Sequence, residues 1–174
     1  FTITDNDAAP IAAFSGNFLI GVNNTTVTSQ SPFRSNLQKF RIQSLYTAAE
    51  LQAAGILTAS SLTSMTMRIT VKNSTQAYNG FTISLANTGA GNLSTGFISP
   101  AFTQVYTGNY SSVVGDNVFT FSTPFAWDGT SNVLVNICFD NAPAAADVSA
   151  DVTEATSAPL GAGIRATTYS SSVV

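Results

Sequence analysis

The chain has 174 residues, of which 44% are hydrophobic, enough for one domain with a sizeable core. Only 9% of the residues are charged, against roughly 25% in an average soluble domain, so the surface takes its polarity from Ser, Thr, Asn and Gly. Six scattered basic residues and a net charge of -3 argue against nucleic acid and anionic membranes as partners. No apolar run has the length of a membrane span. Such a surface suits the outside of a cell or a packed assembly.

The first residues of the chain are predicted to form a segment of their own. Residues 1–7 read FTITDND, an alternation typical of a strand, and the Ala-Ala-Pro stretch that follows reads as a linker. Compact apolar sequence begins at Asn17. We therefore expect residues 1–16 to be an N-terminal extension or linker strand and residues 17–174 to be one β-sandwich domain.

Further along, short stretches alternate between apolar and polar residues, which is the pattern of strands with one buried face. Turn sequences such as Gly-Asn at 108–109 and Gly-Asp at 115–116 separate them. The predicted strands are residues 37–46, 62–72, 81–85, 102–106, 117–122 and 132–139, with weaker candidates at 151–156 and 164–169.

Residues 47–55 are the one predicted helix, about two turns long. Thr47 can cap its first turn, Glu50 stands three residues later as in a capping box, and Gly55 can end it. Many short strands, one small helix and no internal repeat predict an all-β fold. The expected architecture is an antiparallel two-sheet sandwich of the jelly-roll type.

Residues 132–139 are predicted to be a strand in the middle of a sheet, because both of its faces are largely apolar. The turn before it, with the sequence WDGTSN, supplies a glycine and short polar side chains where the chain reverses. Residues 117–122 are expected to pair with this strand as a long-looped hairpin. Phe125 and Trp127 are expected to fold over the end of the sheet.

The densest part of the core is expected around the inward side chains of these two strands, Phe119, Phe121, Val133, Val135, Ile137 and Phe139. Cys138 also lies there and is the only cysteine, which excludes an internal disulfide. We interpret it as a small buried hydrophobe rather than as a reactive thiol.

Two blocks of sequence stand out, SLYTAAELQAAGI at residues 44–56 and PFAWDGTSNVLVNICFDN at residues 124–141. In this order and spacing they resemble a family of jelly-roll-like modules in the secreted surface proteins of Bacteroidota. The resemblance covers residues 17–141 and implies export by type IX secretion, neighbouring adhesin-like domains and no catalytic motif. Residues 1–7 resemble the last strand of a Calx-beta domain.

The chain contains no histidine, which excludes every catalytic triad that uses imidazole. With a single buried cysteine, zinc and copper sites are excluded as well. Asp128 and Asp140 flank the predicted central strand, but a glycosidase pair would also need a cleft with several sugar contacts. We interpret them as turn aspartates, and the sequence predicts no enzyme.

Asp5 and Asp7 have the oxygen chemistry and the short spacing that calcium uses. Because two carboxylates are too few, a calcium site there would need ligands from another domain or subunit. No other cofactor is expected. The acids Asp147, Asp151 and Glu154 are expected to lie on a solvated face.

Four aromatic residues, Trp127, Tyr78, Tyr106 and Tyr110, are candidates for a platform that stacks on a sugar ring. Trp127 has a second interpretation as a cap on the core, since it stands between Phe125 and a tight turn.

The sequence therefore favours a non-catalytic, extracellular or cell-surface β-sandwich module in adhesion or in a surface or matrix structure. Its expected partners are other copies of itself or neighbouring domains of a larger surface protein. One alternative is a carbohydrate-binding module of a secreted enzyme. Another is a filament subunit joined by strand donation, in which Phe1, Ile3 and Ile11 would form the apolar stripe of the donated segment. Pairing of that segment within its own domain, or with a preceding one, is the competing interpretation.

Overall fold

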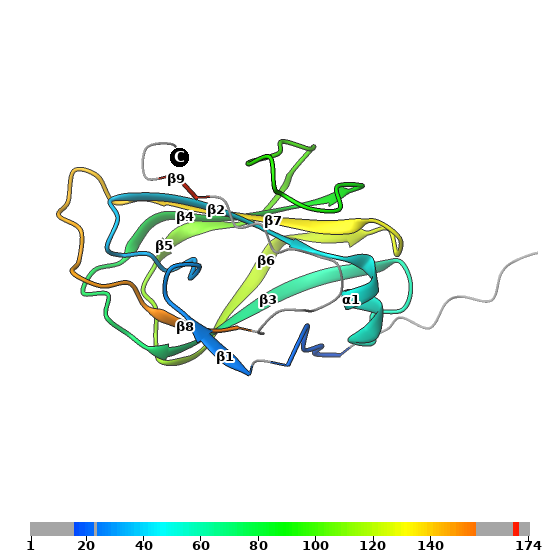
Figure 1. Cartoon of the computed structure of the whole chain (residues 1–174), viewed down its shortest axis with the longest axis horizontal. Coiled ribbons are helices and arrows are strands. Elements are labelled where there is room, and N and C mark those ends of the chain that lie inside the picture. The colour runs from blue at the N-terminus through cyan, green and yellow to red at the C-terminus, as the bar shows by residue number, and fades with distance from the viewer. Residues whose placement is uncertain (1–15, 23, 156–168, 171–174) are drawn as a thin grey trace, which may run out of the picture.

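The computed structural model describes residues 16–22, 24–155 and 169–170. Within these ranges the chain forms nine strands and one short helix, and the strands make two antiparallel sheets packed face to face (Figure 1). Each sheet buries one face against the other, which is how a sandwich removes apolar surface from water. The predicted all-β, two-sheet sandwich is confirmed.

The two sheets have the strand order of a jelly roll. Consecutive strands from β1 to β4, and again from β5 to β8, alternate between the sheets. One sheet contains, in order, β1 (Thr25–Val27), β8 (Val152–Ala155), β3 (Ser60–Val71) and β6 (Gly115–Trp127). The other contains β5 (Thr103–Tyr110), β4 (Tyr78–Thr88), β7 (Asn132–Asp140), β2 (Lys39–Tyr46) and β9 (Tyr169–Ser170).

The expected hairpin between residues 117–122 and 132–139 is wrong. β6 pairs with β3 in the four-stranded sheet, whereas β7 lies between β4 and β2 in the other sheet. The connecting turn therefore crosses the sandwich instead of reversing within one sheet. It is packed tightly, since Gly129 has a φ of 84° and a β-carbon there would lie 2.5 Å from the Ala59 nitrogen. The side-chain amide of Gln52 donates to the Gly129 carbonyl at 3.0 Å and holds the turn.

The helix α1 (Ala48–Ala53) has the ends that its sequence predicts. The Thr47 hydroxyl accepts the Glu50 N–H at 3.2 Å, and the Glu50 carboxylate accepts the Thr47 N–H at 2.8 Å. This reciprocal pair is a capping box. Gly55 follows with a φ of 108° and donates its N–H to the Gln52 carbonyl, which stops the helix.

The core between the sheets is built around packed aromatic rings. The ring of Phe119 lies 5.3 Å from that of Phe81 and 4.5 Å from that of Tyr110, centre to centre. Phe33, from the loop before β2, stacks on Phe81 at 5.5 Å. The six residues expected in the core belong to this cluster and are buried, so the expectation is confirmed for Phe119, Phe121, Val133, Val135, Ile137 and Phe139.

The central strand β7 is buried on its outer face as well. Leu134 packs there with Leu45 of β2 and with Leu93 of the connection between β4 and β5. The side-chain amide of Gln43 donates to the Ile98 carbonyl at 2.8 Å and accepts the Ile98 N–H at 3.0 Å. The β4–β5 connection therefore covers the outer face of the five-stranded sheet, which explains why both faces of β7 read as apolar.

One predicted turn lies inside a strand. β5 continues through Gly108 and Asn109, because Gly108 pairs with Phe81 of β4. The hydroxyl end of Tyr106 lies over Gly108 and occupies the space that a side chain there would fill. Of the two weaker strand candidates, the one at residues 151–156 is confirmed as β8 over Val152–Ala155. The candidate at residues 164–169 lies outside the described residues except for Tyr169, which belongs to β9.

Replacing Ile137 by Ala tests the burial of β7. Ile137 is 4% exposed, so we expect the free energy of unfolding to fall by about 2–5 kcal/mol in denaturant titrations. Val118→Ala is the matched control, because Val118 is 56% exposed on the outer face of β6 and its loss should cost less than about 0.5 kcal/mol. Equal effects of the two substitutions would contradict the assigned faces.

Candidate binding groove between the sheets

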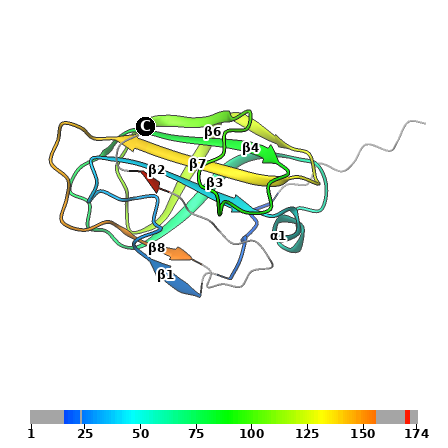
Figure 2. The same ribbon diagram turned by 45° about the horizontal axis from the view of Figure 1, so that its top comes forward.

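A groove of about 1180 Å³ opens between the two sheets. The opposite side of the sandwich is closed, because edge strand β5 of one sheet contacts edge strand β6 of the other. In Figures 1 and 2, α1 lies at one end of the sandwich, and β1 and β8 lie together along its lower side. The groove is lined by both sheets, by β8 and by residues 16–20.

One wall of the groove is the backbone edge of β3. Its neighbour β8 pairs with it only at Ile69 and Val71, and β6 occupies the other edge from Ser60 to Ile69. Residues 60–68 all line the groove, although their side chains point alternately to the two faces of the sheet. Among the described residues, this stretch of edge has no strand beside it. An edge of this kind can take up an added strand through its outward-pointing N–H and C=O groups.

The floor of the groove is the inner face of the five-stranded sheet. Every second residue of β2 and β7 reaches it, and most are apolar: Ile42, Ser44, Tyr46, Val133, Val135 and Ile137. Leu51 and Ile56 also line it. A strand laid along β3 would thus cover apolar side chains as well as gain main-chain hydrogen bonds.

Three side chains of β3 point toward this floor without being fully covered. Leu62, Met65 and Met67 are only partly buried, although they pack against the core. The sequence pattern correctly assigned the two methionines to the inner face of their strand. The pattern gave no sign that the two methionines line an opening. Alternation of apolar and polar residues indicates the face of a strand on which a side chain lies, and it does not indicate which strands lie beside that strand.

Charge is concentrated at the β8 end of the groove. The Arg68 guanidinium lies 3.1 Å from Asp116 and 3.1 Å from Glu154. Arg68 and Asp116 are exposed and Glu154 is partly buried, so the two pairs contribute little to stability. Because one positive charge faces two negative charges, the net charge at this end of the groove is negative. The β3 residues toward α1 are uncharged.

The buried carboxylate of Asp151 fixes the start of β8. It accepts the backbone N–H groups of Asn73 and Ser74 at 2.6 and 2.7 Å. It also accepts the hydroxyls of Ser74, Tyr78 and Ser112 at 3.0, 3.0 and 2.6 Å. The expectation that Asp151 is solvated is wrong, because this ring of donors replaces water around the charge.

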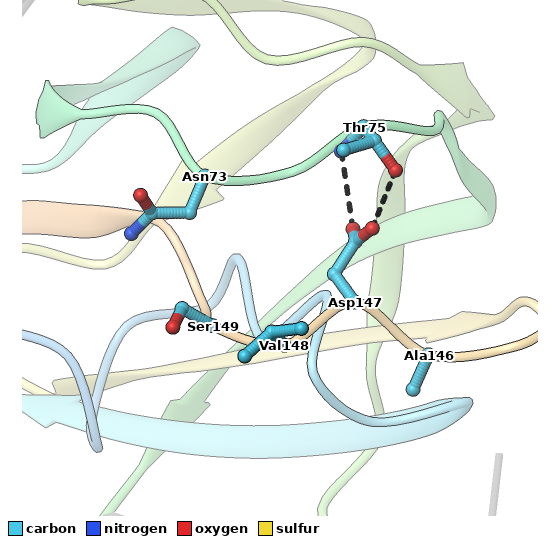
Figure 3. A pocket seen from close by; sticks show the side chains of 6 residues that line it. All are labelled: Asn73, Thr75, Ala146, Asp147, Val148 and Ser149. Carbon is cyan, nitrogen blue, oxygen red and sulfur yellow. Dashed lines mark hydrogen bonds between the residues drawn. The ribbon is translucent and has the colours of Figure 1, made fainter.

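Asp147 is a surface residue beside a small depression that Asn73, Thr75 and Ser149 also line (Figure 3). Its carboxylate accepts the N–H and the hydroxyl of Thr75 at 3.1 and 2.5 Å. Burial alone raises the pKa of Asp147, but the hydrogen bonds from Thr75 outweigh it, and the pKa is lowered. Asp147 ties two loops together at this end of the sandwich.

The four candidate aromatic residues do not form an exposed platform. Trp127 is 1% exposed and donates its ring N–H to the Ser131 carbonyl at 2.8 Å, which matches its interpretation as a cap on the core. Tyr78 is 0% exposed, and burial, followed by the Asp151 charge, raises its pKa. Tyr106 and Tyr110 are partly buried against the core, and burial, then the neighbouring Tyr106, raises the pKa of Tyr110. Sugar binding elsewhere stays a prediction.

Asp128 and Asp140 lie too far apart for a glycosidase pair. Asp140 is the last residue of β7, and Asp128 lies in the turn before its first residue, Asn132. The strand between them is roughly 26 Å long at about 3.3 Å per residue, against the roughly 5–9.5 Å that such enzymes need. Hydrogen bonds from Ser131 and Thr130 lower the pKa of Asp128 to about 2. The Lys39 ammonium, 2.7 Å away, and the Ala142 N–H lower the pKa of Asp140. Asp128 is a turn aspartate, as interpreted, whereas Asp140 is the last residue of β7 and pairs with Lys39 of β2.

The remaining sequence predictions concern cysteine, metal and assembly residues. Burial raises the pKa of the Cys138 thiol, which Arg41 opposes, and the residue is partly rather than fully buried. The described residues contain no group of three or more acidic, His or Cys side chains that could hold a metal ion. The calcium candidates Asp5 and Asp7 and the assembly residues Phe1, Ile3 and Ile11 lie outside the described residues.

Comparison with protein-family models, with curated proteins and with solved structures gives no match. Across the described ranges, no helix is long and apolar enough to cross a membrane.

Replacing Asp151 by Asn tests the ring of donors. The amide would turn a donor toward groups that already donate, so we expect the free energy of unfolding to fall by about 3 kcal/mol or more. Asp147→Asn is the control, since Asp147 is only partly buried and its carboxylate accepts two hydrogen bonds from Thr75, and it should cost about 1 kcal/mol or less. Denaturant titration of both variants makes the comparison. Similar losses would mean that the Asp151 network does not anchor β8.

Proposed function

We propose that this chain is a non-catalytic, extracellular β-sandwich module that acts in cell-surface adhesion or in a surface or matrix structure by binding extended polypeptide. The observation that carries the proposal is a groove with an apolar floor beside a stretch of the β3 edge that no described strand accompanies. A strand edge offers alternating donors and acceptors at a fixed spacing, and only another extended main chain can satisfy them in register. Such a site suits assembly and adhesion.

The use of the polar side chains supports this proposal. Three aspartates have their carboxylates engaged by groups that hold the fold together. Asp151 accepts the Asn73 N–H, Asp128 accepts the Ser131 N–H, and Asp140 pairs with the Lys39 ammonium. The low charge of the surface favours close contact between modules because it weakens their mutual repulsion. The two sequence blocks at 44–56 and 124–141 support an origin among the secreted surface modules of Bacteroidota, and export by type IX secretion is part of the same proposal.

The test compares peptide and glycan ligands on the full chain. We expect saturable binding to arrayed peptides with alternating apolar side chains. Peptides about eight residues long match the stretch of β3 that lines the groove. Met67→Arg places a charge in the groove and should weaken that binding at least tenfold, by roughly 1.4 kcal/mol or more. Val118→Arg adds the same charge on the outer face of β6 and should leave it unchanged.

Circular dichroism and melting curves of both variants must show that each is folded. Saturable glycan binding that survives Met67→Arg would overturn the proposal in favour of a carbohydrate-binding module. Peptide binding that is equally weakened by both arginines would also overturn it, because the groove would then not be the site.

A further inference from the structure

We propose that the outer face of the five-stranded sheet carries a second binding site, which takes the carboxylate of an Asp or Glu side chain of a polypeptide partner. Arg41 of β2, Asn136 of β7 and Ser84 of β4 form this carboxylate site. It lies on the opposite face of the sheet from the groove. The inference therefore goes beyond the proposed function and does not depend on the groove.

The three side chains share one face of the sheet. Asn136 pairs with Ser84 on one side and with Gln43 on the other, and residues paired across strands point to the same face. Arg41 stands two residues before Gln43 in β2, so its side chain points the same way. Ile42, between them, is buried in the core between the sheets. The shared face is therefore the outer one.

The covered part of this outer face ends at Gln43. Leu45 and Leu134 lie under the connection between β4 and β5, which Figure 1 shows in green above the sheet. Gln43 is 0% exposed, and its amide bonds to the Ile98 backbone of that connection. Arg41, one row further along the sheet, is only partly buried. The carboxylate site thus lies at the margin of the covered area, where a ligand can reach it.

Neighbouring groups fix the direction of the Asn136 amide. Because the Ile98 N–H can only donate, Gln43 turns its oxygen toward it and its nitrogen toward the Ile98 carbonyl. That nitrogen donates to the Asn136 oxygen at 3.3 Å, and the Arg41 Nε donates to the same oxygen at 2.7 Å. Since both neighbours are donors, the oxygen of Asn136 faces them and its nitrogen faces the other way.

Two donors beside the guanidinium are left unused by this arrangement. Asn136 and Ser84 are each 8% exposed, and within the described ranges neither the Asn136 Nδ2 nor the Ser84 hydroxyl has a hydrogen-bond partner. Neither atom is sealed off, because the fully enclosed side-chain atoms without a partner, in that same part of the chain, belong to Glu50 and Asn87. A nearly buried donor is costly without an acceptor, so the site favours an acceptor from outside.

Arg41 is held firmly but keeps the outer end of its guanidinium unused. Its Nε is engaged by Asn136, and its central carbon lies 4.5 Å from the centre of the Phe97 ring, which fixes the plane of the group. Among the described residues, ion pairs form at Lys39 and Arg68 but not at Arg41. Its two terminal nitrogens are the fork that binds both oxygens of a carboxylate.

The balance of donors and acceptors favours an acidic side chain over an acidic sugar. The Asn136 oxygen already accepts two hydrogen bonds, and the Gln43 oxygen accepts one. The site therefore offers mainly donors. A carboxylate only accepts, whereas the hydroxyls beside the carboxylate of a sugar acid would need acceptors as well. The side chains of Asp and Glu carry no such hydroxyls.

The partner must be recognised here through its side chain rather than its main chain. β2, β7 and β4 are interior strands of the sheet, and Arg41 itself pairs with Cys138 on one side and with Ser170 on the other. Their main-chain groups are used within the sheet, so no strand can add at this place. A single protruding carboxylate suits the site, because Asn136 and Ser84 are reached only through a small opening.

Nuclear magnetic resonance of the full ¹⁵N-labelled chain tests the site with sodium acetate as the probe. The side-chain N–H signals of Asn136 should shift saturably with acetate and should not shift with sodium chloride at equal concentration. Arg41→Lys keeps the charge but removes the fork, so it should weaken acetate binding about fivefold or more. Ser84→Ala removes one donor and should weaken it about twofold or more.

Lys39→Gln is the matched control, because Lys39 lies on the same face of β2 but is engaged by Asp140. It should leave the acetate affinity unchanged within about twofold. The backbone signals report that each variant is folded. Equal acetate affinity of Arg41→Lys and the unchanged chain would overturn the proposal, because charge alone would then attract the anion. Absence of a saturable shift at Asn136 would overturn it too.

Two larger probes with four carboxylates each identify the source of the carboxylate. A peptide of four Gly-Glu repeats should bind about fourfold more tightly than acetate, because any of its carboxylates can enter the site. The same peptide with Gln in place of Glu should not shift Asn136. Tighter binding of tetragalacturonate than of the Glu peptide would overturn the assignment to a polypeptide, and so would a Glu peptide that does not bind.

Met67→Arg separates this site from the groove. The acetate and Glu-peptide shifts at Asn136 should be the same in Met67→Arg as in the unchanged chain, because Met67 lies in the other sheet and lines the groove. Loss of these shifts in the folded Met67→Arg variant would overturn the assignment to the outer face. Failure of the peptide array to depend on Met67 would overturn the proposed function and leave the carboxylate site standing.

Discussion

The fold depends on one buried charge, the carboxylate of Asp151. Its five hydrogen bonds draw together the start of β8, the loop after β3, the start of β4 and the loop before β6. A buried carboxylate without such donors would cost several kcal/mol, so these loops must take up positions that supply them. The N–H of Asp151 adds a bond to the carbonyl of Phe33, whose ring is stacked in the aromatic core. One residue thus connects the end of the sandwich to its centre.

The same anchor determines where the groove begins. β8 leaves Asp151 and accompanies β3 only at Ile69 and Val71, so the rest of the β3 edge is left without a described neighbour. In a jelly roll this position belongs to β8, which is described as far as Ala155.

Sequence reasoning worked where local chemistry decides the outcome. The Thr47–Glu50 capping box, Gly55 after the helix and the alternation in β7 each depend on residues close in the chain. It failed where the answer depends on distant partners. From the sequence, Asp151 has the features of a surface acid, because Ser74, Tyr78 and Ser112 come close to it only in the folded chain. The turn at Gly129 has the sequence of a hairpin turn, but the strand before it, β6, pairs with β3, and the strand after it, β7, pairs with β4. The groove likewise depends on how the two sheets are placed relative to each other, because residues from both of them line it.

Hydrogen–deuterium exchange, in the unchanged chain and in the Asp151→Asn variant, tests the central claim most directly. If the Asp151 carboxylate holds the loop after β3, the amides of Asn73 and Ser74, which donate to it, should be protected in the unchanged chain and should exchange at least tenfold faster in the variant. The amides of the central strand β7 should stay protected in both proteins and report that the fold persists. Unchanged protection of Asn73 and Ser74 in the variant would contradict the account.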